Sequence, residues 1–142
     1  MTTRRVLLVA FMILCAAFMA CRKSTPLFNA QPIDIPQTSA GKLTLDEIRE
    51  TIIKAASRQG WTIVSQSPGV VTARLVARHD YSVTVDIRYT ETAYTITYND
   101  SAKLNYNPKS QSIHPAYGRW IAYLTRSINV ELHNAPLLLH AQ

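Results

Sequence analysis

The most constraining feature of this 142-residue chain is the alternation of side chains over residues 81–90. Aromatic and β-branched residues occupy every second position, and polar or charged residues fill the positions between them. Successive side chains of a β-strand point to opposite faces of the sheet, so this pattern predicts a strand with one buried and one solvated face. The positions predicted to be buried are Tyr81, Val83, Val85, Ile87 and Tyr89.

Three more strands are predicted around this one, over residues 61–66, 70–77 and 94–99. The connections between the four strands are short and contain turn-forming residues such as Pro68 and Gly69. Short connections join antiparallel neighbours, so we expect a four-stranded antiparallel meander. Its solvated face is predicted to be a hydroxyl-rich plane formed by Ser82, Thr84, Arg88, Thr95 and Thr97.

A helix is predicted before the meander. Thr44 and Glu47 have the spacing of a capping box, Leu43 and Ile48 that of a hydrophobic staple, and Gly60 suits the helix end. The predicted apolar face consists of Leu45, Ile48, Ile52 and Ala55 or Ala56.

A second helix is predicted after the meander, from about His114 to Pro136. Its apolar stripe follows helical spacing and consists of Tyr117, Ile121, Leu124, Ile128 and Leu132. Helices packed on one face of an antiparallel sheet form a two-layer α+β domain, which we place at residues 43–139.

Residues 1–20 have the pattern of an export signal. Arg4 and Arg5 precede an uncharged, mostly apolar run over residues 6–20, which is shorter than the ~20 residues that span a bilayer. A basic start, a short apolar run and a small residue before a cleavage site are typical of secretory signal peptides. The small residue here is Ala20, and Cys21 follows it.

Residues 18–21, Phe-Met-Ala-Cys, resemble the lipobox of bacterial lipoproteins. In that class the cysteine thiol receives a diacylglycerol, and cleavage makes this cysteine the first residue. The resemblance therefore implies lipidation at Cys21, and Arg22 in place of Asp implies sorting to the outer membrane, facing the periplasm. Two alternatives stay open, namely an uncleaved anchor helix and an ordinary signal peptide with an incidental cysteine.

Residues 21–42 are predicted to be the lipidated cysteine and a flexible tether, because prolines recur among polar residues without apolar periodicity. Removal of Arg4 and Arg5 with the signal lowers the formal charge of +6 by two, to +4. A basic exported domain suits an anionic membrane surface, and we expect no nucleic-acid partner. Since Cys15 is lost with the signal and Cys21 takes the lipid, we expect no disulfide. No Cys/His cluster with metal-binding spacing occurs in the sequence, so we expect no metal, and we expect no cofactor.

Two strings in the second half resemble a group of small, uncharacterised lipoproteins of Gram-negative bacteria. Residues 98–106 fit Tyr-x-x-Ser-x-x-Leu-x-Tyr, and residues 113–124 fit Ile-His-x-x-Tyr-x-x-Trp-x-x-x-Leu. Gly118 stands where that group often has Asn. The resemblance covers residues 94–130 together with the lipobox, and it implies a location and a fold but no activity.

These strings supply the candidate site. We expect a loop over residues 100–111. We also expect Tyr117, Trp120 and Leu124 to lie on one helix face beside the sheet, with the segment of residues 98–106 wrapped around the helix start. The alternative is a shallow pocket for a sugar, a peptide or an anion, which requires Tyr106, His114 or Trp120 to be partly exposed. In the first case Asp100 or Ser101 would bond the helix N-terminus or His114. The candidate binding or structural residues are Asp100, Ser101, Tyr106, His114, Tyr117 and Trp120.

Serine, histidine and aspartate, the residue types of hydrolases, also occur here. They are Ser101, Ser112, His79, His114 and Asp100. No nucleophile-elbow motif surrounds either serine and no motif indicates a catalytic triad, so we predict that the protein is not an enzyme. The predicted function is that of a membrane-anchored accessory or interaction module that docks on another protein of the cell envelope. The alternative is a lipid-anchored domain that binds a small ligand.

Overall fold

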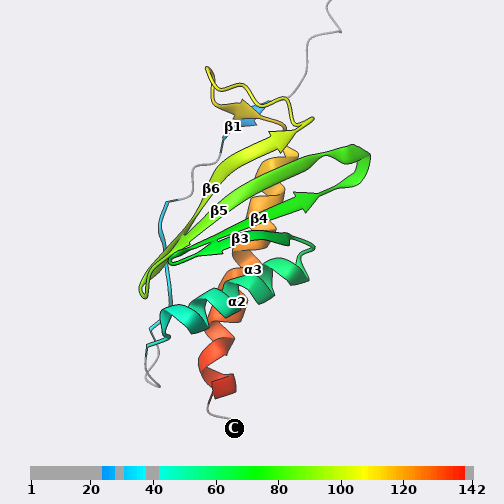
Figure 1. Cartoon of the computed structure of the whole chain (residues 1–142). Coiled ribbons are helices and arrows are strands. Elements are labelled where there is room, and N and C mark those ends of the chain that lie inside the picture. The colour runs from blue at the N-terminus through cyan, green and yellow to red at the C-terminus, as the bar shows by residue number, and fades with distance from the viewer. Residues whose placement is uncertain (1–23, 28–30, 38–41, 140–142) are drawn as a thin grey trace, which may run out of the picture.

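The structure is a computed structural model that describes residues 24–27, 31–37 and 42–139. Two helices lie on one face of a five-stranded antiparallel sheet, and a two-stranded ribbon stands at one end of it (Figure 1). The predicted α+β class is therefore confirmed. The predicted signal and Cys21 lie outside the described residues.

The predicted meander forms the centre of the sheet. Its strands are β3 (Thr62–Ser67), β4 (Val70–Val76), β5 (Ser82–Tyr89) and β6 (Ala93–Ala102). A short strand, β2 (Ile33–Asp34), pairs with β6, so the order across the sheet is β2-β6-β5-β4-β3. The four-stranded meander is thus present, with one further strand added at the β6 edge.

The alternation in β5 divides the sheet into two faces. Val83, Val85, Ile87 and Tyr89 are buried, as predicted, beneath the helices. Tyr81, also predicted to be buried, precedes the strand and is only partly buried. Ser82 lies on the opposite face but is also buried, because Arg74 of the neighbouring strand extends over it and donates to its hydroxyl at 3.3 Å.

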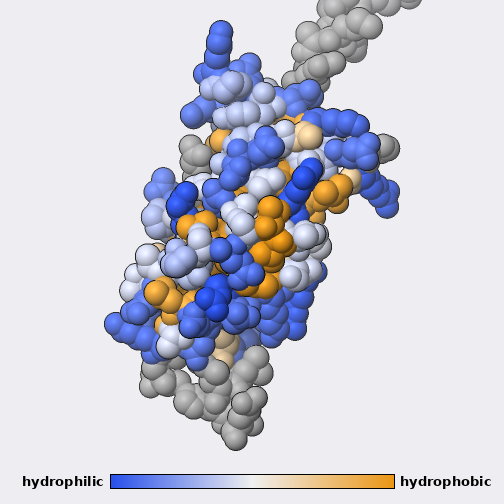
Figure 2. Space-filling model, viewed as in Figure 1, coloured by the Kyte–Doolittle hydropathy of each residue, from blue (hydrophilic) through white to orange (hydrophobic). Residues whose placement is uncertain are grey.

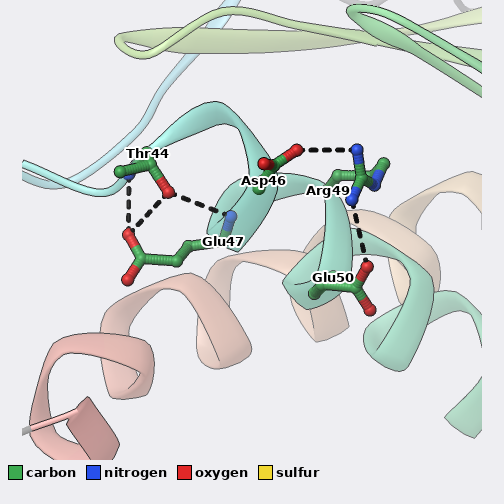
Figure 3. Close-up of polar contacts among 5 residues, drawn as sticks. All are labelled: Thr44, Asp46, Glu47, Arg49 and Glu50. Carbon is green, nitrogen blue, oxygen red and sulfur yellow. Dashed lines mark hydrogen bonds and ion pairs between the residues drawn. The ribbon is translucent and has the colours of Figure 1, made fainter.

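Helix α2 (Leu45–Arg58) begins at the predicted capping box (Figure 3). Thr44 Oγ1 accepts from the Glu47 amide at 3.3 Å, and the Glu47 carboxylate accepts from the Thr44 amide at 2.7 Å. The prediction that Leu45 faces the core is wrong, since Leu45 is 44% exposed. It lies in the first turn beside the β3–β4 turn, where it lines a surface hollow.

Helix α3 (Ala116–Leu139) carries the predicted apolar stripe, which is buried from Tyr117 to Leu132. In Figure 1 the helix passes behind the strands and continues beyond the sheet beside α2. The prediction that Pro136 ends the helix is wrong, because α3 continues three residues further, to Leu139. A proline removes only one helical hydrogen bond there, and the last turn has few such bonds left to lose.

The described part of the predicted tether lies on the domain. Residues 24–27 and 31–37, here called the N-terminal strap, include β1 (Thr25–Pro26) and β2. β1 pairs with β7 (Ser112–Ile113), and β2 pairs with β6. For these residues the prediction of a mobile tether is wrong, because pairing with the sheet satisfies the strap's backbone and buries Ile35.

Candidate functional site

A β-bulge in β6 decides where two of the candidate site residues lie. Val85 faces Tyr98 and Thr84 faces Asp100, so Asn99 is an extra residue between them. The bulge resets the alternation and puts Tyr98 and Ser101 on the same face of the strand, where their hydroxyls are 2.9 Å apart. Asp100 and Ser101 were predicted in a loop, but both lie in the strand, which continues to Ala102.

Three tyrosines pack together next to this bulge. The Tyr98 ring lies 4.4 Å from the Tyr106 ring and 6.0 Å, edge-on, from the Tyr117 ring. Such tilted and edge-on contacts are the favourable arrangements of aromatic pairs. The pKa of Tyr98 is raised, mainly by burial, while its hydrogen bond with Ser101 acts in the opposite direction. The cluster joins β6, the following loop and α3.

Tyr117 is the most deeply buried member of the cluster. Its side chain is fully buried, and within the described part of the chain its hydroxyl has no hydrogen-bond partner. Burial raises its pKa well above the usual tyrosine range. A buried hydroxyl without a partner costs free energy, so its ring is what stabilises this position.

His114 caps α3. Its Nδ1 accepts from the Ala116 amide at 3.1 Å, and its own amide donates to the Leu104 carbonyl at 2.9 Å. Its ring stacks on Tyr81 at 5.8 Å. The predicted wrapping of the loop around the helix start is therefore present, but His114 itself, rather than Asp100 or Ser101, bonds the free amide.

The remaining candidates differ in exposure. Tyr106, His114 and Trp120 are each half-buried, and Tyr106 and Trp120 pack against the core. Asp100 is exposed at the end of β6, and the Ser112 hydroxyl lies 2.8 Å from that of Ser110. The partial exposure that the ligand pocket requires is thus present.

A second cluster, which the sequence analysis did not identify, lies on the opposite face of the sheet. Asp86 accepts from Thr72 Oγ1 at 2.8 Å and from Asn99 Nδ2 at 3.1 Å on each oxygen. Thr97 Oγ1 donates to the Asp86 carbonyl at 3.2 Å, and Arg88 Nη2 lies 3.9 Å from the carboxylate. The bulge residue Asn99 thus completes an ordered polar network that links three strands.

We call this surface the polar face. It consists of the outward side chains of β4, β5 and β6, and in Figure 1 it is the side of the sheet turned away from α3. Figure 2, drawn from the same direction, shows hydrophilic residues over most of this side, interrupted by apolar patches. The members of the polar face are Thr72, Arg74, Val76, Thr84, Asp86, Arg88, Thr95, Thr97 and Asn99.

Two open hollows lie away from the tyrosine cluster. One, of about 480 Å³, lies between Asp34 and Pro36 of the strap and Asn129 and His133 of α3. The other, of about 330 Å³, lies between the first turn of α2 and the β3–β4 turn. Neither of these two is lined by Tyr106, His114 or Trp120.

Within the described ranges, no group of three or more His, Cys, Asp or Glu side chains could hold a metal ion. No helix of the same residues is long and apolar enough to cross a bilayer. Comparisons with models of protein families, with curated proteins and with solved structures found no match to this chain.

Proposed function

We propose that this chain is a lipid-anchored protein of the cell envelope that docks through its polar face on a second envelope protein. The anchor is inferred from the sequence, in which a basic start and a short apolar run precede Ala20 and Cys21. The docking role is inferred from the surface that the domain leaves uncovered.

The observation that carries the proposal is the order of the polar face. The described helices both pack on the other side of the sheet, and the Asp86 network holds side chains from β4, β5 and β6 in place. Side chains that are ordered before binding lose less conformational entropy when a partner arrives. An open, ordered sheet face suits a protein surface better than a small molecule, which is usually enclosed in a concave pocket.

The charges of the polar face indicate the chemistry of the partner. The Asp86 carboxylate accepts hydrogen bonds from Thr72 and Asn99, and the Arg88 guanidinium lies 3.9 Å from it with its side chain 61% exposed. Arg74, further along the same face, is also exposed and donates to Ser82, so two solvent-accessible guanidinium groups lie on the polar face. We expect a protein partner that presents carboxylates opposite them, since arginine binds carboxylates through paired hydrogen bonds.

Ligand binding at the tyrosine cluster remains the alternative. The half-exposure of Tyr106, His114 and Trp120 supports it, although Tyr106 and His114 already contact tyrosine rings of the domain. Trp120→Ala separates the two functions. A variant that merely unfolds supports a structural role for Trp120, and a folded variant that loses a bound ligand supports the pocket.

Cross-linking in intact cells tests docking. The full chain is tagged at its C-terminus, and cross-linked proteins are identified by mass spectrometry. We expect one recurrent partner, which is lost in Arg88→Glu and kept in Arg126→Glu, a matched charge reversal at an exposed position of α3. Equal recovery of the partner with both variants would contradict docking through the polar face.

The lipid anchor has its own test. Cys21→Ser should abolish labelling with a radioactive fatty acid and release the protein from the membrane fraction. The intact mass of the wild-type protein should in turn show cleavage before Cys21 and the added acyl groups. Unchanged mass and fractionation in the Cys21→Ser variant would exclude lipidation at this residue.

A further inference from the structure

The strap attaches the beginning of the described chain to one end of the domain. Thr25 and Pro26 pair with Ile113 and Ser112, and the Leu27 amide donates to the Gln111 carbonyl at 2.6 Å. In Figure 1 this ribbon stands at the end of the molecule opposite the last turns of α3. The position of Thr25 is therefore fixed relative to the sheet.

The distance from this ribbon to the predicted anchor is limited by covalent geometry. Thr25 follows Cys21 by four residues, and an extended chain spans at most about 3.6 Å per residue, or about 14 Å in all. The apolar run of residues 6–20 ends just before Cys21. The limit therefore applies equally to a lipidated Cys21 and to an uncleaved anchor helix.

We infer that the ribbon end of the domain faces the membrane and contacts anionic lipid headgroups. This end, here called the proximal end, comprises β1, β7, the loop of residues 103–111 and the 3-10 turn Arg78–Asp80. The inference rests on the proposed N-terminal anchor. It adds to that proposal an orientation and the surface that touches the bilayer.

The charges of the two ends agree with this orientation. At the proximal end Arg78, Lys103 and Lys109 are exposed, against the acids Asp80 and Asp100, and Lys103 Nζ lies 3.1 Å from Asp80. Arg22 and Lys23 add two positive charges to the sequence between Cys21 and this end. The five acids at the opposite end outnumber the three cations there, which are Lys42, Arg49 and Arg88. These acids are Asp34, Asp46, Glu47, Glu50 and Glu91.

Screening in physiological salt leaves charges effective over about 8 Å, so only the end of the domain that lies close to the bilayer senses the bilayer charge. An anionic bilayer would attract the proximal end, which the short connection keeps near it, and would repel the acidic end if the domain turned that end towards it. The loop of residues 105–111 is otherwise neutral and polar, so it can approach headgroups without burying a carboxylate.

Fluorescence resonance energy transfer from a dye at either of two sites on the protein to dyes on the lipid headgroups tests the orientation. The full acylated chain is reconstituted in vesicles of phosphatidylethanolamine and phosphatidylglycerol at 3:1, with an acceptor dye on a small fraction of the headgroups. A donor dye is attached to Ser110→Cys at the proximal end or to Ser67→Cys, the last residue of β3, at the opposite end. Both serines are exposed.

We expect transfer to be several times more efficient from position 110 than from position 67. A flexible Gly-Ser insertion of about 20 residues between Lys23 and Ser24, with a mean span of about 25 Å, should reduce this difference. If the insertion leaves the difference unchanged, the short connection does not orient the domain.

Two results separate the orientation from the anchor. An acylated chain with equal transfer from both sites would overturn the orientation and leave the anchor in place. A chain without acyl groups that does not associate with vesicles would overturn the anchor and the orientation with it. The intact mass of each labelled sample decides between these two cases.

Discussion

Lys54 Nζ of α2 lies 3.0 Å from Glu131 Oε2 of α3, and the Glu131 side chain is only 8% exposed. Arg58, one turn further along α2, binds the other carboxylate oxygen. A buried carboxylate is thus shared by two cations whose own side chains reach solvent. Removing one partner of such a group is costly when it leaves a buried charge uncompensated.

Single and double removal of these cations should therefore be non-additive. Lys54→Gln alone should lower the free energy of unfolding by less than about 1 kcal/mol, because Arg58 still compensates Glu131. The double variant Lys54→Gln, Arg58→Gln should lower it by about 3 kcal/mol, more than the sum of the two single changes. Urea denaturation of the four proteins measures this, and strict additivity would show that the cations act independently.

Loss of the hydroxyl should lower the stability of the domain at Tyr94 but not at Tyr117. Tyr94 donates to Asn129 Oδ1 at 2.7 Å, so Tyr94→Phe should cost about 1 kcal/mol of stability. The Tyr117 hydroxyl is buried without a partner among the described residues, so Tyr117→Phe should be neutral or slightly stabilising. Thermal and urea unfolding report both, and a large loss in Tyr117→Phe would indicate a partner for this hydroxyl, such as a buried water.

The same two tyrosines make stability depend on alkaline pH. Burial raises the pKa of both above the value of about 10 in an unfolded chain. Their contribution is therefore complete below pH 10 and is lost as the pH rises above it, because the unfolded chain releases the protons first. The urea midpoint should fall between pH 9 and about pH 11.5, and less steeply in the double Phe variant. Tyr123→Phe, at an exposed position of α3, should leave the slope unchanged.

The N-terminal strap should contribute to the stability of the domain. Ile35 is only 3% exposed and its amide donates to the Thr92 carbonyl at 2.8 Å. Ile35→Ala should lower the free energy of unfolding by about 2–4 kcal/mol, as for other buried isoleucines. Gln31→Ala, at an exposed position of the same strap, should have no effect. Equal stability of the two variants would show that the packing of Ile35 on the domain contributes nothing to the stability of the fold.

The fold class could be predicted because its signals are local. The alternation of β5, the Thr44–Glu47 capping box and the stripe of α3 each depend on spacing within one element, and all three are present in the structure. Two other features could not be predicted from local spacing. The capping of α3 by His114 depends on side-chain geometry. The extension of β6 through Ser101 depends on a one-residue bulge.

The polar pairs missed by the sequence analysis join distant segments. Glu131 lies 77 positions after Lys54, and its place among the apolar residues of α3 was the available signal. A carboxylate next to a buried stripe requires a cation from another element. Lys54 and Arg58 are four residues apart on α2, so they lie on the same helix face and supply two such cations. The strap has no recognisable periodicity in the sequence, because β1 and β2 each pair over only two residues, and two residues are too few to produce a pattern.

The strap also makes the two edges of the sheet unlike. β2 lies along one edge, whereas β3 is an outermost strand of six uncharged residues with Val64 57% exposed. Such an edge is a template for pairing with another chain, and its ladder is interrupted only by the irregularity between Ile63 and Ser65. Copies held on one membrane by the proposed anchor would meet at high local concentration. The extra residue of β3, Val64, twists this edge locally and so opposes the pairing of copies into a continuous sheet.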